Sequence, residues 1–379
     1  MIKSFSITGY RKFNKIKVDD LGKVNVITGI NNSGKSSFLE AVFAWSCGNN
    51  IGKMLKGSIA RSARYMSKAQ KSPYWFLDLI LQAFYERKEA PLSMCLSAVD
   101  ENTDLRAFTH TVLPSDLINE VTRLNAEPAK VAEFYNAYQM TLQKLSDTPS
   151  IESSRVFPAI AKWSVADSKG SVNSYDITQN NLDNFGLGSF INTILVDVLS
   201  YTKTDELELI TILLKRAQLL NNLVDDLKEV FPFVKTIDVI TYPDRTGIPF
   251  VFSEDKNDPL PIYAFGDGLQ RYFYILGSMI LNQNGIMCID EVDVGLHYSS
   301  QIDFCHSLLK YAQKYNVQVF LTTHNLEFLD NLIDATDKSS ILDDLRVITL
   351  KKSDTVMKHR VLSGIEAKRA RFGFELDLR

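Results

Sequence analysis

Features of membrane, secreted and nucleic-acid-coating proteins are scarce in this sequence of 379 residues. Its four cysteines show no C-x-x-C spacing, so we expect reduced thiols in the core rather than disulfides or a zinc site. The longest apolar stretch, 185–201, is interrupted by Asn192 and Asp197, which argues against a membrane span. The first residues alternate like a strand and contain no apolar signal segment, so we expect a cytoplasmic protein.

The charge and composition are those of an ordinary globular protein. A formal net charge of -3 argues against a surface that binds nucleic acid along its whole extent. Hydrophobic residues make up 45% of the chain and charged residues 23%, which allows one large domain or two ordinary ones with a substantial core. The sequence shows no Ser/His/Asp triad, zinc-ligand spacing or G-x-G-x-x-G motif.

A complete phosphate-binding motif, G-x-x-x-x-G-K-S, occupies residues 29–36, called the P-loop below. The β-branched residues 24–28 predict a strand before it, and 37–43 predict a helix after it. Such a loop directs backbone N–H groups at phosphate oxygens, and the helix amino terminus adds positive potential. We expect Lys35 to contact the β- and γ-phosphates of ATP and the Ser36 hydroxyl to bind Mg²⁺. The nucleotide-binding residues predicted here are Gly29, Asn31, Asn32, Ser33, Gly34, Lys35, Ser36 and Ser37.

Two apolar runs in the second half of the chain end in polar residues. Residues 285–291 predict a buried parallel strand that delivers Asp290 and Glu291 to the edge where α/β sheets bind their ligands. Asp290 can complete the Mg²⁺ shell, and Glu291 can orient or deprotonate the attacking water. Residues 317–323 predict another such strand, ending at His324. Asp290 and Glu291 are called the acid pair below. A lone histidine is more often structural, but the position of His324 after a P-loop and the acid pair favours a contact near the γ-phosphate.

A third signal lies upstream in residues 265–271, called the signature segment below. Gly266 and Gly268 stand just before the apolar, helix-like stretch 272–280, and two glycines that open a helix make a second anion site. Because the P-loop already supplies one phosphate site, this one would serve the nucleotide of a neighbouring subunit. The alternative is a glycine-rich helix entry without a ligand.

In this order, the elements resemble those of ABC-type ATPases of the SMC, RecF and OLD group. The string "IDEVDVGLH" at 289–297 is similar to the "IDEPExGLHP" pattern of OLD-type defence ATPases, and 10–13 is similar to the family's "NFRSF" segment. The resemblance implies catalytic roles for Lys35, Glu291 and His324, and Mg²⁺ ligands at Ser36 and Asp290. It also implies nucleotide contacts by Arg11, Gly266, Asp267, Gly268 and Arg271.

Three positions bear on how far this resemblance extends. Gly266 stands where the family has the signature serine, and Val292 stands where a proline is expected after the catalytic glutamate. Gln82 lies in a plausible region for the Q-loop glutamine, but it could equally be a residue on a helix surface.

The fold class predicted is α/β, an ABC-type P-loop ATPase fold with an inserted helical subdomain. We expect an amino-terminal ATPase lobe at 1–100, a helical insertion at 101–232 and a carboxyl-terminal ATPase lobe at 233–379. Apolar spacing predicts a helix over 116–147. A 3-4-3-4-3 repeat over 210–227 favours a packed helical hairpin or bundle over a free coiled coil. Residues 233–263 show strand-like patterning and should rejoin the ATPase sheet.

The resemblance leaves three functions open. The first is the ATPase subunit of a bacterial anti-phage system such as PARIS, which forms at least a dimer through its ATP sites and controls a separately encoded effector, expected to be a nuclease. The stretch after His324 is too short for the nuclease domain of OLD-family proteins. The second is a RecF-like DNA-repair ATPase, and the third is an ATP-dependent scaffold that hydrolyses slowly. The basic residues after position 350 could form a solvated face or contact nucleic acid or an acidic partner.

Overall fold

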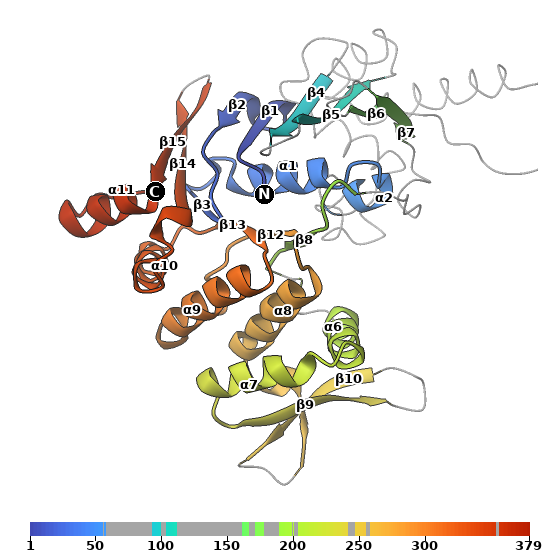
Figure 1. Ribbon diagram of the computed structural model, residues 1–379, viewed down its shortest axis with the longest axis vertical. Coiled ribbons are helices and arrows are strands. Elements are labelled where there is room, and N and C mark those ends of the chain that lie inside the picture. The colour runs from blue at the N-terminus through green and yellow to red at the C-terminus, as the bar shows by residue number, and fades with distance from the viewer. Residues whose placement is uncertain are drawn as a thin grey trace, which may run out of the picture.

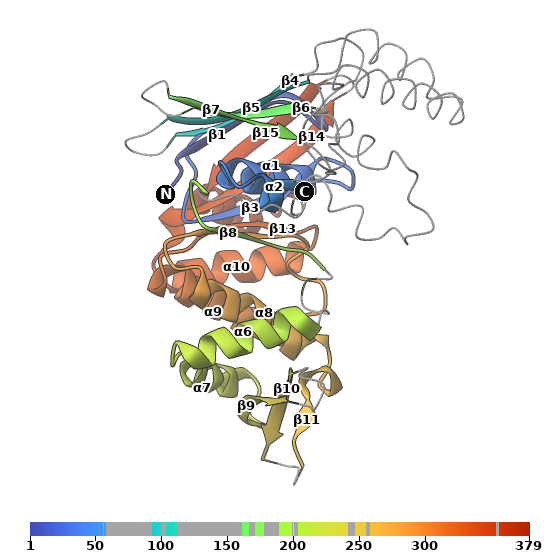
Figure 2. The ribbon, with the colours of Figure 1, turned by 90° about the vertical axis from the view of Figure 1, so that its right-hand side faces the viewer.

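The computed structural model describes residues 1–55, 57, 93–99, 104–111, 161–166, 171–177, 189–198, 200, 204–241, 247–254, 258–353 and 356–379. Figures 1 and 2 show these residues as a stack of layers, with an antiparallel sheet at one end and a small sheet at the other. Between them lie α1, a central sheet and a layer of helices. Within the described part, no helix is both long and apolar enough to cross a membrane.

The central sheet carries the P-loop strand in its interior. Five of its strands are parallel, and β15 pairs antiparallel at one edge. All five residues of β3, Val24–Thr28, are buried, as expected for a strand covered on both faces. The strand order is β15 (Val356–Ser363), β14 (Leu345–Ser353), β3 (Val24–Thr28), β13 (Gln318–Thr322), β12 (Ile286–Ile289) and β8 (Thr193–Val196).

Helix α1, Lys35–Ser46, lies between the central sheet and the antiparallel sheet (Figure 1). Its apolar residues are buried almost all round, which is the pattern of a helix enclosed by protein. Phe5 of β1 packs edge-on against Phe38 and Trp45 of α1, with ring centroids 5.8 and 6.1 Å apart. The antiparallel sheet has the order β2 (Phe13–Val18), β1 (Ser4–Tyr10), β4 (Ser93–Val99), β5 (Asp104–Thr111), β6 (Ala161–Ala166) and β7 (Val172–Ile177), and the short α2 (Ile51–Met54) follows α1.

The helices of the carboxyl-terminal half cover the other face of the central sheet (Figure 2). They are α8 (Asp267–Leu281), α9 (Tyr298–Lys314) and α10 (Leu326–Lys338), with the short α11 (Gly364–Lys368) beside α10. Beyond them lie α6 (Thr204–Arg216), α7 (Leu220–Val230) and a sheet of β9 (Val234–Thr241), β10 (Gly247–Ser253) and β11 (Leu260–Pro261). The fold class is confirmed as mixed α/β around a central mixed sheet.

The apolar repeat over 210–227 belongs to two helices rather than one. The chain leaves α6 after Arg216 and enters α7 at Leu220, and Gln218 between them has a φ of 58°. A positive φ cannot continue a right-handed helix, so the repeat crosses a turn. Leu213, one of its members, is 38% exposed. The two helices pack against each other, as the hairpin interpretation requires.

Two other expectations need correction. Residues 233–263 do not rejoin the ATPase sheet; they form the separate sheet β9–β11, whose inner side packs on α6 and α7 instead. The segment 101–232 is not wholly helical, because it contains β5, β6, β7 and the central strand β8. The domain boundaries themselves stay a prediction. The helix expected over 116–147 and Gln82 lie outside the described residues.

Candidate nucleotide-binding site

The predicted strand, loop and helix around the P-loop are confirmed. β3 ends at Thr28 and α1 begins at Lys35. Gly29 and Gly34 have φ angles of 141° and 94°, so both take conformations that L side chains rarely adopt. A Cβ at Gly29 would lie 2.4 Å from the carbonyl oxygen of Leu350, and one at Gly34 would lie 3.0 Å from the Phe13 ring. The two glycines are therefore required by the loop's shape and by its neighbours.

Ser36 and Asp290 meet although they are 254 residues apart in sequence. The Ser36 hydroxyl donates to Asp290 Oδ1 at 3.1 Å, and the Thr322 hydroxyl donates to the same oxygen at 2.7 Å. Thr322 also accepts the N–H of Glu291 at 2.8 Å, so one side chain of β13 orients both acidic residues. Thr322 was not predicted from the sequence, although its place at the end of a strand is a usable signal.

The donor set at this point fits Mg²⁺ and a phosphate chain. A serine hydroxyl and a carboxylate are oxygen ligands of the kind that Mg²⁺ prefers. The hydroxyl of Ser33 is buried, and among the described residues it has no hydrogen-bond partner. An unpaired polar atom inside a phosphate-binding loop is available to a ligand.

Lys35 points back over the P-loop. Its Nζ donates to the carbonyl oxygens of Gly29 at 2.7 Å and Ile30 at 3.1 Å. Partial burial lowers the pKa of Lys35, and the nearby carboxylates of Asp290 and Glu291 oppose that shift. The ammonium thus lies against the carbonyls at the start of the loop, within reach of the charges of Asp290 and Glu291.

Glu291 and His324 follow two neighbouring parallel strands, so both lie at the P-loop edge of the sheet. Glu291 is half-buried and has a φ of 49°, a sharp turn in which the chain leaves the strand direction just past β12. His324 is exposed just past β13. The next acid, Asp293, accepts a hydrogen bond from the Thr323 hydroxyl at 2.6 Å. The structure thus places Glu291 and His324 at the edge that carries Lys35, Ser36 and Asp290, and their catalytic roles stay predictions.

Arg271 does not have the position expected of a residue that contacts a second protomer's nucleotide. It is fully buried, and its guanidinium donates to the carbonyl oxygens of Glu291 at 2.6 Å and Asp290 at 3.3 Å. The first turn of α8 directs the side chain inward, under the loop after β12. Its role in this structure is to hold the backbone that presents the acid pair.

Replacing Arg271 with Met should therefore destabilise the fold and lower nucleotide hydrolysis together. Hydrogen bonds to a charged group are worth about 1.5–3 kcal/mol each, so the loss of both should lower the free energy of unfolding by about 3–6 kcal/mol. Urea unfolding and steady-state turnover measure the two effects. Arg216→Met is the matched control, because Arg216 is exposed at the end of α6. Equal stability of the two variants would contradict this role.

Within the signature segment, Gly266 and Asp267 face solvent, whereas Leu269 and Gln270 are buried. Gly266 and Asp267 are exposed at the start of α8, and the space around the Cα of Gly266 is open. Gly268 lies against the turn that follows the acid pair, since a Cβ there would be 3.5 Å from the carbonyl oxygen of Gly295. This helix start is therefore accessible to another molecule, and its contact with a nucleotide stays a prediction.

The turn between β1 and β2 contacts the P-loop through Lys12. Its Nζ donates to the carbonyl oxygen of Asn32 at 2.9 Å. Arg11, the residue suggested by the resemblance, instead pairs with Glu40 of α1 at 3.1 Å and donates to the Tyr10 hydroxyl at 3.2 Å. A nucleotide contact of Arg11 stays a prediction. The sequence analysis did not single out Lys12.

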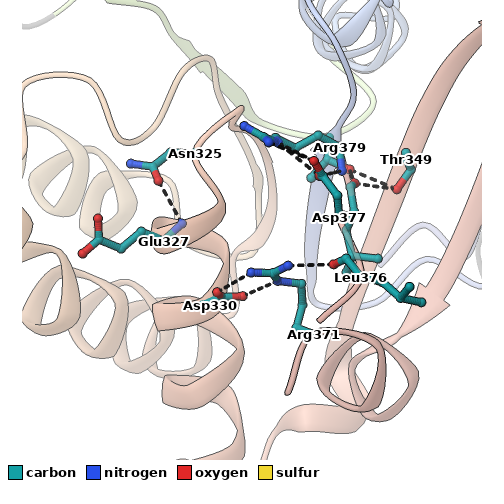
Figure 3. A network of polar contacts seen from close by, with 10 residues as sticks. Asn325, Glu327, Asp330, Thr349, Arg371, Leu376, Asp377 and Arg379 are labelled. Atoms are coloured by element: carbon teal, nitrogen blue, oxygen red, sulfur yellow. Dashed lines mark hydrogen bonds and ion pairs between the residues drawn. The ribbon is translucent and has the colours of Figure 1, made fainter. Parts of the chain in front are cut away.

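The last residues of the chain lie beside the P-loop strand (Figure 3). Leu378 is fully buried, and its carbonyl oxygen accepts hydrogen bonds from the hydroxyls of Thr28 and Thr349. Arg371 forms a two-pronged ion pair with Asp330 at 2.6 and 2.7 Å and donates to the carbonyl oxygen of Leu376. Lys368 pairs with Asp337 at 2.6 Å, so two of the basic residues noted in the sequence are committed to α10.

Comparison with known proteins agrees with this site. Residues 152–330, which contain the signature segment, the acid pair and His324, match a family described as "AAA domain, putative AbiEii toxin, Type IV TA system". The chain is 24% identical to a Helicobacter pylori protein named ATP/GTP phosphatase, with 96% of each chain covered. It is 28% identical over 111 residues to an uncharacterised protein of Methanocaldococcus jannaschii, which covers 29% of this chain and 97% of that protein.

Two solved structures were also found to be similar. An SMC head bound to the C-winged helix domain of ScpA has 14% identity and a TM-score of 0.47, with 97% of this chain and 99% of that chain covered. The SMC head domain from Thermotoga maritima has 11% identity and a TM-score of 0.44, with coverages of 96% and 99%.

The P-loop lies between β3 and α1, and the acid pair follows β12, which is separated from β3 by one strand, β13. This arrangement decides the class of ATPase fold. The fold is that of a P-loop ATPase. Residues 152–330, less than half of the chain, are similar to the AbiEii-type family. The narrower resemblance to OLD-type and PARIS-type ATPases stays a hypothesis.

Proposed function

We propose that this protein is an ATP-hydrolysing switch that controls a separate effector protein. The observation that carries the proposal is the convergence of Ser36, Asp290 and Thr322 beside the ammonium of Lys35. Lys35 binds the β- and γ-phosphates, and the backbone N–H groups of the P-loop bind the remaining oxygens. Ser36 and Asp290 would hold Mg²⁺, which would supply charge neutralisation at the phosphates.

Hydrolysis requires a group that accepts a proton from the attacking water, and we assign that step to Glu291. Its backbone N–H is fixed by Thr322 and its carbonyl by Arg271, so the residue is held on both sides of its Cα. His324 lies at the end of the neighbouring strand, where it can orient the γ-phosphate or the water. The relative named ATP/GTP phosphatase supports hydrolysis, and we propose ATP as the nucleotide.

Two protomers would enclose two nucleotides, each between one P-loop and the partner's signature segment. This arrangement comes from the resemblance, and the exposed start of α8 is compatible with it. Large apolar residues are exposed in the P-loop and on α9: Ile30 at 63%, Tyr298 at 64% and Ile302 at 45%. Burying them in a dimer would favour association. ATP binding would drive association, and hydrolysis would loosen it.

The second activity is assigned to a separate effector protein. A switch needs a second activity to control, and the family match describes toxins of toxin–antitoxin systems. We propose that the chain is the sensor subunit of an anti-phage defence complex and that its effector is a nuclease. The effector would be encoded next to this protein, as subunits of one complex often are.

The test is to co-express the protein with the product of the neighbouring gene and to measure mass by light scattering with and without ATP. We expect a dimer or larger assembly with ATP, containing both proteins. A monomer that ignores both ATP and the neighbouring protein would contradict the proposal.

Direct DNA binding is the second candidate, because β14 and β15 present a basic face. Lys351 and Lys358 lie directly opposite each other, and Arg360 follows on the same face of β15. All three are exposed, and like charges placed opposite each other in a sheet are destabilising. Tight duplex DNA binding with a steep dependence on salt, lost in Lys351→Glu/Lys358→Glu, would favour a repair ATPase.

A further inference from the structure

Three lysines from three separate elements surround the P-loop. Lys12 belongs to the turn between β1 and β2, Lys35 opens α1, and Lys352 lies near the end of β14. Only Lys35 belongs to the phosphate-binding motif. The other two need an explanation from the structure.

Lys12 is fixed on the tip of the loop. Its Nζ lies 2.9 Å from the carbonyl oxygen of Asn32, a residue with a φ of 67°. The next residue, Phe13, is fully buried, and its ring lies against Gly34. The turn that carries Lys12 is therefore held against the P-loop at two points, Asn32 and Gly34.

Lys352 approaches the loop from the other side. The parallel pairing of β14 with β3 matches Thr349 with Thr28, so residues 350–352 continue alongside the start of the P-loop. The carbonyl of Leu350 is the group that excludes a Cβ from Gly29. Lys352 pairs with Met357, which packs on the same core cluster as Leu350 and Phe13. Lys352 thus lies on the face of the hairpin that is directed at β2 and Lys12.

The electrostatics of this cluster are unfavourable as it stands. Burial lowers the pKa of Lys12, and the charges of Lys352 and Lys35 lower it further. Three ammonium groups around one loop repel each other unless an anion lies between them. A polyphosphate chain carries several negative charges and binds in this loop.

We propose that Lys12 and Lys352 bind the phosphate chain of the nucleotide together with Lys35, so that the site recognises its ligand largely through phosphate charge. This inference rests on the proposed function and adds two phosphate-binding residues that the motif does not contain. Inorganic triphosphate, which has the chain without the base and ribose, is therefore a competitor of ATP.

An alternative is that Lys12 only fastens the loop through Asn32. That role needs one hydrogen bond and predicts nothing for Lys352, for which the structure shows no hydrogen bond to the loop. Such a tether, the hydrogen bond from Lys12 to Asn32, would stabilise the conformation of the P-loop without adding charge at the ligand. Its loss would therefore leave the dependence of binding on salt unchanged.

The experiment measures binding of ATP and of sodium tripolyphosphate, each with Mg²⁺, to Lys12→Met and Lys352→Met at two salt concentrations. We expect each change to weaken both ligands about 10-fold at low salt and to make the salt dependence shallower. Lys15→Met and Lys351→Met are matched controls, because Lys15 is exposed farther along β2 and Lys351 lies on the opposite face of β14. Both controls should bind within about twofold of the unchanged protein.

The outcomes separate this inference from the proposed function. Wild-type affinity in Lys12→Met and Lys352→Met, with binding lost in Lys35→Ala, would overturn the inference and leave the function standing. Weakening in Lys12→Met alone, with an unchanged salt dependence, would also overturn it in favour of the tether. If the unchanged protein binds neither ATP nor tripolyphosphate, the proposed function fails.

Discussion

Lys35→Ala should abolish tight ATP binding, weakening it by about 100-fold or more. The change removes the ammonium that lies against the P-loop, 2.7 Å from the carbonyl oxygen of Gly29. No other lysine or arginine lies within the loop itself, so the β- and γ-phosphates lose their nearest positive charge. Isothermal titration calorimetry with ATP and Mg²⁺ measures the loss.

The fold should survive this change, which makes the result interpretable. Lys35 is partly exposed, and its two hydrogen bonds go back to the loop in which it lies. Thermal unfolding should therefore differ little from that of Lys15→Ala, a control on the exposed side of β2. ATP affinity equal to that of the unchanged protein would show that the P-loop assignment is wrong.

Glu291→Gln should keep ATP binding and lose hydrolysis by about 10²–10⁴-fold, the range for removal of a general base. Glutamine keeps the size and hydrogen bonding of the side chain, and the hydrogen bonds of the Glu291 backbone to Thr322 and Arg271 do not depend on the carboxylate. The variant should accumulate as an ATP-bound assembly. Phosphate release and light scattering with ATP measure the two effects.

Unchanged turnover in Glu291→Gln would move the catalytic role to another group. His324 would be the stronger candidate, because the Asp293 carboxylate already accepts the Thr323 hydroxyl and His324 is exposed. Loss of turnover without loss of cellular function would instead favour the slow scaffold. Double variants with His324→Ala distinguish these cases.

The sequence predicted the site best where a residue suited to nucleotide chemistry directly follows a buried strand. The strands 24–28, 285–290 and 317–323 are apolar runs that end in polar groups, and the structure places all three side by side. Thr322 was not foreseen because a threonine at a strand end has no distinctive pattern until its neighbours are known. The inward direction of Arg271 was not foreseen because a motif gives the order of residues and not the direction of a side chain, and its nucleotide contact stays a prediction.

Elsewhere, the apolar patterns predicted whether a segment is a helix or a strand better than they predicted where it ends and what it pairs with. The repeat of 210–227 is helical on both sides of Gln218, but a single positive φ divides it, and glutamine carries little signal for that conformation. Within 233–263, the described segments β9, β10 and β11 are strands, as the pattern predicted. Their pairing with one another rather than with the central sheet depends on α6 and α7, whose positions the pattern could not give.

The position of β3 in the central sheet has a consequence for biosynthesis. Its neighbours on both sides, β13 and β14, come from the far end of the chain. At about 5–20 residues per second, the roughly 300 intervening residues take about 15–60 s to translate. During that time an apolar strand with free edges emerges from the ribosome, while the antiparallel sheet, built from the first 177 residues, can already pair. The nascent chain is therefore exposed to aggregation and to chaperone binding until its nucleotide site can assemble.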